Sequence, residues 1–265
     1  MKQVGFIGAG NMATAIIDGL IRTNAQYAQN ITVFDVLEEK LEIMRNKGVN
    51  TTDSVVSVAE KCGIIVLAVK PQNYAQVLEE MSKADCKDKV IVTIAAGIST
   101  DYIAKALGCE CAMVRVMPNT PLLLGQGASA LCRRNISDED FEFVYSMFAN
   151  GGTAEILNEA QMNSVIAVNG SSPAYIYLFA KAMADYAKQE GIDEEKALRL
   201  ICAAFRGSAE MIEKSGDDID TLIKKVSSPG GTTLKALEKL DEKDFYNSII
   251  EAMQACTKRA EELAL

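Results

Sequence analysis

The sequence has 265 residues, which at about 150 residues per domain corresponds to one large or two modest domains. Hydrophobic residues make up 49% and charged residues 24%, as is typical of globular proteins, and this composition argues against disorder. Asp and Glu outnumber Lys and Arg by 36 to 27, and a net charge of −9 disfavours a nucleic-acid partner. Because no apolar run approaches about 18 residues and no targeting segment is recognised, we expect a cytoplasmic protein without a membrane span.

The sequence lacks histidine, which excludes Ser–His and Cys–His nucleophile pairs, histidine general bases and histidine-containing metal sites. Its seven cysteines form no C-x-x-C pair, so we expect neither a metal site nor a disulfide framework. We interpret them as reduced, mostly buried thiols. The chemistry of any enzyme built on this chain would then come from an organic cofactor.

Short β-branched runs alternate with helical patterns through the first half of the chain. Apolar runs such as residues 64–69 are typical of strands that are covered on both faces, as in a parallel sheet. The expected strands are 4–7, 31–34, 64–69, 90–94, 112–117 and 128–132, and the expected helices are 11–24, 38–46, 73–82 and 100–107. This alternation predicts an α/β domain over residues 1–158, with a Rossmann-like, doubly wound and mostly parallel sheet.

From residue 159 onward the pattern is only helical, and two apolar stripes with spacings of three and four need a partner surface. The stripes are Leu198, Ile201, Phe205, Ser208 and Met211, and then Phe245, Ile249, Met253, Cys256, Ala260 and Leu263. We expect residues 159–265 to form an all-helical domain that is closed by a second copy in a homodimer. The alternative is that the stripes fold back on the sheet domain of the same chain.

A G-x-G-x-x-A motif lies between the first expected strand and the first expected helix. Its residues are Gly8, Ala9, Gly10, Asn11, Met12 and Ala13. The motif predicts a dinucleotide site, because Gly8 permits a tight turn, Gly10 lets the backbone approach a pyrophosphate, and the helix N-terminus favours an anion. A glycine-rich turn without a ligand is the alternative.

Asp35 follows the second expected strand, where a carboxylate accepts hydrogen bonds from the ribose diol of a dinucleotide. Its charge would repel a 2′-phosphate, and residues 36–39 contain no arginine. The pattern therefore favours NADH over NADPH. The alternative is that Asp35 only caps the helix that begins near Leu37.

Three further loops follow expected strands, at the edge of a doubly wound sheet where ligands bind. We expect them to line the cofactor site, with the small residues 95–97 admitting the nicotinamide ring. Lys70 either meets phosphate or is a solvated lysine, and Asn119 either contacts nicotinamide or substrate or forms an Asx-turn. The candidates in these loops are Ala68, Val69, Lys70, Pro71, Ala95, Ala96, Gly97, Met117, Pro118 and Asn119.

Two polar, glycine-containing segments, 169–175 and 227–233, interrupt the helical domain. Pro173 in the first segment predicts a kink or break. The second segment, SSPGGTT, predicts a loop that leads into a helix N-terminus and binds a carboxylate or phosphate. It lacks the GK[ST] ending of a nucleotide P-loop, and an elaborate helix cap is the alternative.

Six segments occur in order along nearly the whole chain: the glycine motif, AVKP (68–71), AAG (95–97), MPNTP (117–121), GSxPAY (170–175) and SSPGGTT (227–233). Together they resemble the Δ1-pyrroline-5-carboxylate reductases of proline biosynthesis, for which SSPGGTT is the most specific signature. The resemblance implies hydride transfer from NADH or NADPH to the C=N bond of an imino acid, 1-pyrroline-5-carboxylate, giving L-proline. It also implies a helical domain that interlocks in a homodimer, and some members assemble further into decamers.

The resemblance implies residue roles as well. Ser228 and Thr233, with backbone N–H groups near Gly231 and Thr232, would hold the substrate carboxylate, and the two hydroxyl residues are the catalytic candidates. The substrate-binding candidates are Ser228, Gly230, Gly231, Thr232, Thr233 and Asn169.

Three positions depart from the family pattern. Asn169 stands where members usually carry Ser or Thr, a candidate proton donor, and an amide does not act as an acid. Ser172 replaces a glycine beside the pocket. Asp35-Val36 replaces an Asn-Arg pair, and the loss of that arginine again favours NADH.

The residues leave two other functions open. A β-hydroxyacid dehydrogenase has the same domain plan but needs a lysine in a G-x-x-x-K pattern, whereas Lys181 lies 11 residues after Gly170. A non-catalytic NAD(H)-responsive regulator would explain the dinucleotide motif but would leave SSPGGTT without a ligand.

Overall fold

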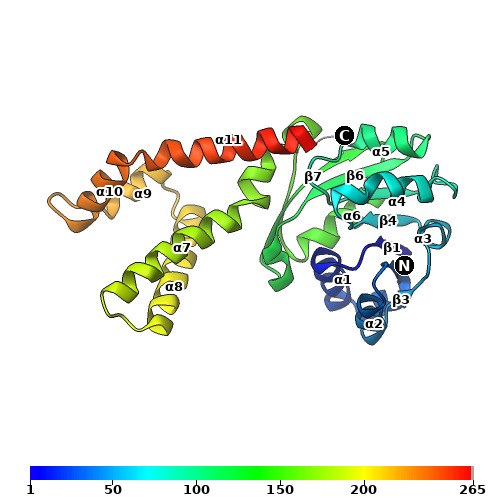
Figure 1. Cartoon of the computed structure of the whole chain (residues 1–265), viewed down its shortest axis with the longest axis horizontal. Coiled ribbons are helices and arrows are strands. Elements are labelled where there is room, and N and C mark those ends of the chain that lie inside the picture. Colours follow the sequence, from blue (N-terminus) through cyan, green and yellow to red (C-terminus); the bar gives the residue numbers. More distant parts are fainter. Residues whose placement is uncertain (264–265) are drawn as a thin grey trace. The chain divides into compact units, whose positions relative to one another are not determined.

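The computed structural model describes residues 1–263, which form two compact units (Figure 1). The first unit comprises Met1–Pro173 together with the chain from Gln254 onward, and the second comprises Ala174–Met253. The first unit is therefore discontinuous in sequence.

An eight-stranded sheet forms the centre of the first unit. Its strands are β1 (Val4–Ile7), β2 (Ile31–Phe34), β3 (Asn50–Thr51), β4 (Ile64–Leu67), β5 (Val90–Thr93), β6 (Ala112–Met117), β7 (Gly127–Arg134) and β8 (Gly152–Ile156). The strand order is β3-β2-β1-β4-β5-β6-β7-β8, and every neighbouring pair is parallel except β6 and β7. The first six strands follow the Rossmann order, so the predicted doubly wound, mostly parallel sheet is confirmed.

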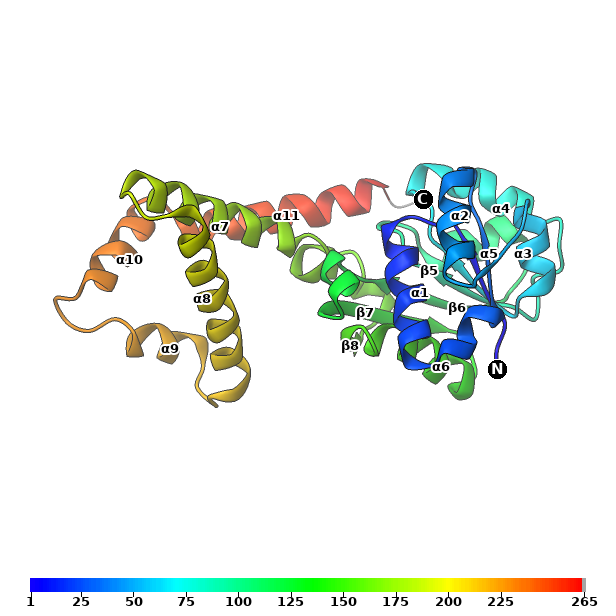
Figure 2. The same cartoon turned by 90° about the horizontal axis from the view of Figure 1, so that it is seen from below.

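Helices cover both faces of this sheet (Figure 2). Alternate strand residues point to opposite faces: Val4 and Phe6 pack in one buried cluster, and Ile7 packs in the other. The first layer contains α1 (Asn11–Thr23), α2 (Glu38–Asn46) and α6 (Asp138–Ala149), and the second contains α3 (Val55–Lys61), α4 (Tyr74–Met81) and α5 (Thr100–Leu107). This two-sided burial is why the strands consist of nearly continuous apolar runs.

All six expected strands and all four expected helices of this half are present, with ends shifted by at most a few residues. The expectation missed β3, β8, α3 and α6, as well as the short 3-10 turns η1 (Ala25–Asn30), η2 (Pro71–Asn73) and η3 (Thr120–Leu124). β3 is only two residues long, and most of β8 is exposed or half-buried, so neither has a clear apolar pattern.

An ion pair between the buried Arg115 and the exposed Glu159 fixes the segment that leaves the sheet. Arg115 on β6 donates from Nη1 to Glu159 Oε1 at 2.9 Å and from Nη2 to Asn163 Oδ1 at 2.6 Å. Cys132, the register partner of Arg115 on β7, donates to Glu159 Oε2 at 2.9 Å. These bonds hold the 3-10 turn η4 (Glu159–Gln161) against the sheet.

The chain then passes through a π turn, η5 (Ile166–Gly170), into α7 (Ser172–Gln189). Pro173 lies in the first turn of α7, where a proline needs no N–H partner. The predicted interruption is thus a change of helix type at the start of α7. Cys256 and Ala260, from the end of the chain, pack beside Met162 and Ile166 in a third buried cluster.

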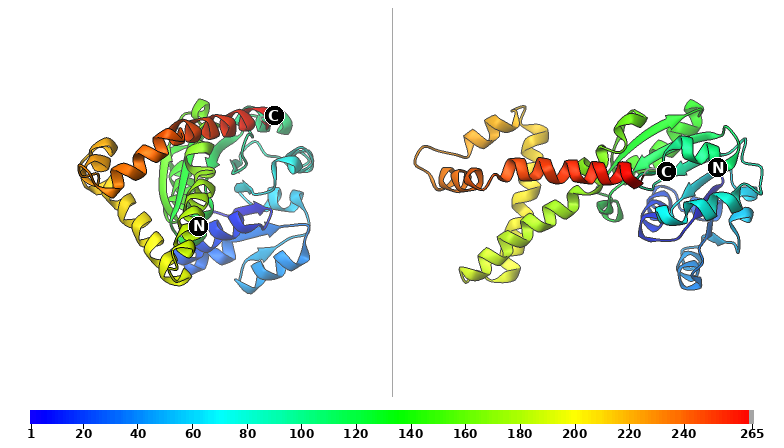
Figure 3. Two further views of the ribbon diagram at one scale, coloured as in Figure 1. Left: turned by 60° about the vertical axis from the view of Figure 1, so that its left-hand side comes forward. Right: turned by 45° about the horizontal axis from the view of Figure 1, so that its top comes forward.

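The second unit is helical (Figure 3). Phe179 stacks on Phe205 with 6.0 Å between ring centroids and lies 6.3 Å from the Phe245 ring. Besides α7, its helices are α8 (Glu194–Lys214), α9 (Ile219–Lys225), α10 (Thr232–Glu242) and α11 (Phe245–Leu263), whose C-terminal part belongs to the first unit. None of the helices within residues 1–263 is both long enough and apolar enough to cross a membrane.

The second unit exposes several large apolar residues, although Ile201 in the stripe of α8 is buried. Leu198 and Met211 are exposed on α8, and Tyr177 and Leu178 are exposed on α7. An apolar surface of this kind calls for a partner. The end of the second stripe belongs to the first unit, where Ala260 is buried.

Candidate active site

Gly8 forms the tight turn predicted between β1 and α1. Its φ is +102°, and its N–H donates to Phe34 O at 2.7 Å. A Cβ at this position would lie 2.6 Å from Ala68 O. Only glycine fits this turn, which joins the ends of β1, β2 and β4.

Gly10 is the N-cap residue of α1, and no side chain caps this helix. A Cβ built on Gly10 meets no atom within 4 Å, so open space lies above the first turn of the helix. Unsatisfied N–H groups and the positive end of the helix dipole face such a space. The loop therefore fits the pyrophosphate of a dinucleotide.

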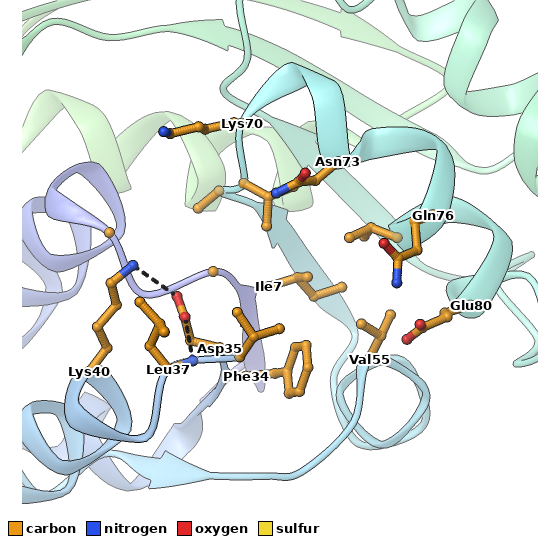
Figure 4. Close-up of a pocket in the computed structure, with 16 residues that line it drawn as sticks. Ile7, Phe34, Asp35, Leu37, Lys40, Val55, Lys70, Asn73, Gln76 and Glu80 are labelled. Carbon is orange, nitrogen blue, oxygen red and sulfur yellow. Dashed lines mark hydrogen bonds and ion pairs between the residues drawn. The ribbon is translucent and has the colours of Figure 1, made fainter.

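Asp35 is hydrogen-bonded to two loops, and Figure 4 shows its contacts with Leu37 and Lys40. Its Oδ2 accepts from Ala9 N at 2.7 Å, and its Oδ1 accepts from Leu37 N at 3.0 Å. Lys40 Nζ lies 3.5 Å from Oδ2, and the Asp35 and Lys40 side chains are 8% and 35% exposed. Asp35 thus binds the N–H of Leu37, the N-cap residue of α2, but no side chain caps this helix, so Asp35 is not its cap. Free lone pairs remain on the carboxylate for a ribose hydroxyl.

A pocket of about 530 Å³ opens at this end of the sheet. The predicted cofactor residues that line it are Gly8, Gly10, Asp35, Ala68, Val69 and Lys70. Sequence reasoning missed Lys40 from α2, Asn73 from η2, and Gln76 and Glu80 from α4. Of these four, Lys40 had a signal in the sequence, since it follows directly after residues 36–39.

Asn119 and Asn169 connect the loop after β6 to the π turn. Asn119 Oδ1 accepts from Ala128 N at 2.9 Å, and its Nδ2 donates to Asn169 O at 3.2 Å. Asn169 Nδ2 donates to Met117 O at 2.7 Å and to Ala128 O at 3.0 Å. Asn119 therefore makes long-range bonds, and these are not the bonds of an Asx-turn. The Asn169 Oδ1 atom is buried without a hydrogen-bond partner within the described residues, which leaves it as an acceptor.

The remaining predicted loop residues do not line this pocket. Ala95 is buried, and Ala96 packs against the cluster that contains Met117 and Ala260. A Cβ at Gly97 would lie 3.0 Å from Ala260 O, so the C-terminal helix passes close to this turn. Ala9, Asn11, Met12, Pro71, Ala95, Ala96, Gly97, Met117, Pro118 and Asn119 are absent from the pocket lining.

The SSPGGTT segment leads into a helix as predicted, and this helix, α10, begins at Thr232, inside the segment. Gly231 N donates to Ser228 O at 2.9 Å, and a Cβ on Gly231 would lie 2.7 Å from Ser228 Oγ. No side chain caps α10, so the capping alternative is not what the structure shows. The Ser228 side chain is exposed and Thr233 is half-buried, and the first-turn N–H groups suit an anion.

The buried thiols are poor candidates for a nucleophile. Four of the seven, Cys62, Cys86, Cys111 and Cys132, are buried, which confirms the expectation of mostly buried thiols. Burial, followed by the hydrogen bond to Glu159, raises the pKa of Cys132 to about 12. Burial likewise raises the pKa of Cys86 to about 11. Both stay protonated near neutral pH, and a neutral thiol is a poor nucleophile.

Comparison with known proteins covers both units. Residues 159–263 match the family model for pyrroline-5-carboxylate reductase dimerisation, and residues 3–97 match the model for coenzyme F420-dependent NADP oxidoreductases. The chain is 38% identical to pyrroline-5-carboxylate reductase from Escherichia coli over 99% of this chain and 98% of the relative. It is 40% identical to the Haemophilus influenzae enzyme of the same name over 99% and 97% of the two chains.

Solved structures give the same similarity. A pyrroline-5-carboxylate reductase from Coxiella burnetii superposes with a TM-score of 0.88 at 32% identity, covering 100% of this chain and 99% of that one. The Plasmodium falciparum pyrroline carboxylate reductase, solved with NADP bound, superposes with a TM-score of 0.92 at 28% identity and covers 100% and 98%.

Proposed function

The chain belongs to the pyrroline-5-carboxylate reductase family, and from this premise we propose which of its residues carry the reaction. It is an NAD(P)H-dependent oxidoreductase of proline biosynthesis that reduces 1-pyrroline-5-carboxylate. Full-length relatives of one activity leave no support for the dehydrogenase or regulator alternatives. Lys181, the residue on which the dehydrogenase alternative rested, is exposed and paired with Asp185.

We propose that α1 and α10 hold the two anionic partners of the reaction. Both helices begin without a side-chain cap, at Gly10 and Gly231, and this shared feature carries the assignment. The diphosphate of the cofactor would bind at Gly8 and Gly10, while Ala68–Pro71, Ala95–Gly97 and Met117–Asn119 would hold the rest of the dinucleotide. The substrate carboxylate would bind the hydroxyls of Ser228 and Thr233 and the backbone N–H groups of Gly230 and Thr232, beside Gly231, whose own N–H already donates to Ser228 O.

The reaction requires little acid–base catalysis by the protein. When bound, the reduced dinucleotide supplies a hydride to the carbon of the C=N bond. If the imine binds already protonated, that carbon is electrophilic and the nitrogen keeps its proton as the amine forms, so no strong general acid is needed. This suits a chain without histidine. The Asn169 amide nitrogen donates its two hydrogen bonds to backbone carbonyls. The residues then act by aligning two bound partners and excluding water.

We propose a preference for NADH over NADPH. The Asp35 carboxylate lies in the pocket beside the glycine loop, where it would accept a ribose hydroxyl and repel a 2′-phosphate. Comparing kcat/KM for the two cofactors tests this, and equal values would contradict it.

The enzyme is a homo-oligomer, because residues 159–263 form the dimerisation region of the family. We propose a homodimer formed through the exposed apolar residues of α7 and α8. The family implies a larger assembly, a decamer built from such dimers. Light scattering coupled to size exclusion measures the assembly, and a monomeric mass would refute the dimer. A cytoplasmic location stays a prediction.

The substrate loop is tested by oxidation of NADH and NADPH at 340 nm with DL-pyrroline-5-carboxylate. Thr233→Ala should mostly raise the substrate KM, because it removes a carboxylate contact made in both ground and transition states. Thr153→Ala, at an exposed threonine of β8, is the matched control and should leave both constants unchanged. A large fall in kcat at unchanged KM would contradict the assignment of Thr233.

A further inference from the structure

Lys40 is a charged residue in the cofactor pocket that the proposed function does not use. It lies in the first turn of α2, where a cation meets the positive end of the helix dipole, so helix stability does not explain its position. Its neighbour Glu38 is paired with Arg45 at 2.6 Å. The Lys40 ammonium instead faces Asp35 across the pocket wall (Figure 4).

Asp35 does not need Lys40 to hold its position. Two backbone N–H groups, from Ala9 and Leu37, already bind its two oxygens at 2.7 and 3.0 Å. The Lys40 contact is longer, at 3.5 Å, at the outer limit of a hydrogen bond. The lysine side chain is 35% exposed on a flexible stem, so it is able to turn to another anion while the carboxylate stays fixed.

We propose that Lys40 is the cofactor-specificity residue that lets this pocket accept a 2′-phosphate on the adenosine ribose. With NADH, Lys40 neutralises Asp35; with NADPH, it binds the added phosphate, which would otherwise face an unbalanced carboxylate. The enzyme would thus use both cofactors with only a modest preference for NADH. The inference rests on the proposed placement of Asp35 at the ribose.

The test measures binding as well as turnover. Calorimetry on the full-length protein gives dissociation constants for 2′,5′-ADP and 5′-AMP, which differ only in the 2′-phosphate, and for NADPH and NADH. For Lys40→Gln we expect about ten- to hundredfold weaker binding of 2′,5′-ADP and NADPH, the range for a charge-assisted hydrogen bond. Binding of 5′-AMP and NADH should change by less than about twofold.

Two lysine variants serve as controls. Lys47 ends α2 and pairs with Asp18 outside the pocket, so Lys47→Gln removes the same charge and should alter neither affinity. Lys70 lines the same pocket. If it binds the diphosphate that NADH and NADPH share, Lys70→Gln should weaken the binding of both cofactors equally.

The outcomes separate this inference from the cofactor assignment beneath it. If Lys40→Gln weakens all four ligands equally, or weakens none, Lys40 is not a 2′-phosphate ligand and the inference fails. Asp35→Asn tests the assignment itself: it should weaken NADH binding and strengthen 2′,5′-ADP binding. If it changes neither while Lys40→Gln still weakens NADPH selectively, the ribose role of Asp35 falls and the role of Lys40 stands.

Discussion

The two glycines of the dinucleotide loop have opposite structural demands, and alanine at each should separate folding from cofactor binding. Gly10 has an ordinary φ of −74°, and a Cβ there meets no atom within 4 Å. Gly8 has a φ of +102°, and a Cβ there would lie 2.6 Å from Ala68 O, closer than real Cβ contacts come.

The expected energies follow from these geometries. For Gly10→Ala, the gain of about 0.4–1 kcal/mol from a less flexible unfolded chain offsets a small loss at the helix cap. Stability should stay within about 1 kcal/mol of the wild type, or about 2–4 °C in Tm. For Gly8→Ala, the left-handed φ alone costs about 1–3 kcal/mol, and the overlap with Ala68 adds to it. Its Tm should fall by more than about 4 °C.

Gly10→Ala, which should hardly change the stability, should weaken cofactor binding. The methyl group of Gly10→Ala occupies the space through which a diphosphate reaches the N–H groups of α1, so the Kd for NADH should rise at least about tenfold. Thermal melts followed by circular dichroism and calorimetry with NADH measure the two effects. Wild-type NADH affinity in Gly10→Ala, or a Tm loss equal to that of Gly8→Ala, would refute the reasoning.

Three further predictions concern the sheet. Glu159→Ala should lower the free energy of unfolding by about 3 kcal/mol, because it leaves the guanidinium of Arg115, 4% exposed, without its carboxylate. The free energy of unfolding should fall as the pH rises above about 8.5, because the thiol of Cys132 ionises there in the unfolded chain. In the folded protein its pKa is about 12, so it stays protonated. The limiting slope for this one group is about 1.4 kcal/mol per pH unit. Tyr74→Phe should cost about 1–3 kcal/mol, because the buried hydroxyl bonds Leu67 O and Thr93 Oγ1, each at 2.9 Å.

Urea denaturation measures all three changes. Arg115→Met is the control for the ion pair: it should cost less than Glu159→Ala, since Glu159 is 41% exposed and can regain water. Cys132→Ala should reduce the slope between pH 8.5 and 10 by the share of this one thiol, while buried Cys86 and Cys111, whose pKa values are also raised, still contribute. An unchanged slope would count against Cys132 as a source. An unfolding free energy of Tyr74→Phe equal to that of the wild type would show that the two hydroxyl bonds add nothing.

The strands and the glycine loop were predictable because local pattern determines them. Apolar runs are buried on both faces, Gly8 belongs to a short motif, and Asp35 directly follows the second strand. Helix α3 was missed because its sequence, VVSVAEK, is rich in β-branched residues. It is helical because Ser54 caps it and because Gly5 on β1 leaves room for Val58, whose Cγ1 would lie 2.4 Å from a Cβ there.

The long-range hydrogen bonds and ion pairs that escaped prediction depend on distant parts of the chain. The Arg115–Glu159 pair joins residues 44 positions apart and needs the β6–β7 register to place Cys132 beside it. The bonds of Asn169 to Met117 and Ala128 likewise span 52 and 41 positions. No short-range pattern contains such partners. Their identity emerges only once the sheet has brought the strands together.

The return of the chain to the first unit after Gln254 has a consequence for the order of biosynthesis. The third buried cluster needs Ala260 beside Met162 and Ile166, and Ser171 Oγ lies 3.3 Å from Cys256 Sγ. A ribosome therefore makes the whole helical unit before it makes the segment that covers this cluster. The nascent sheet unit must wait with that apolar surface open, which makes it a natural client for a chaperone during synthesis.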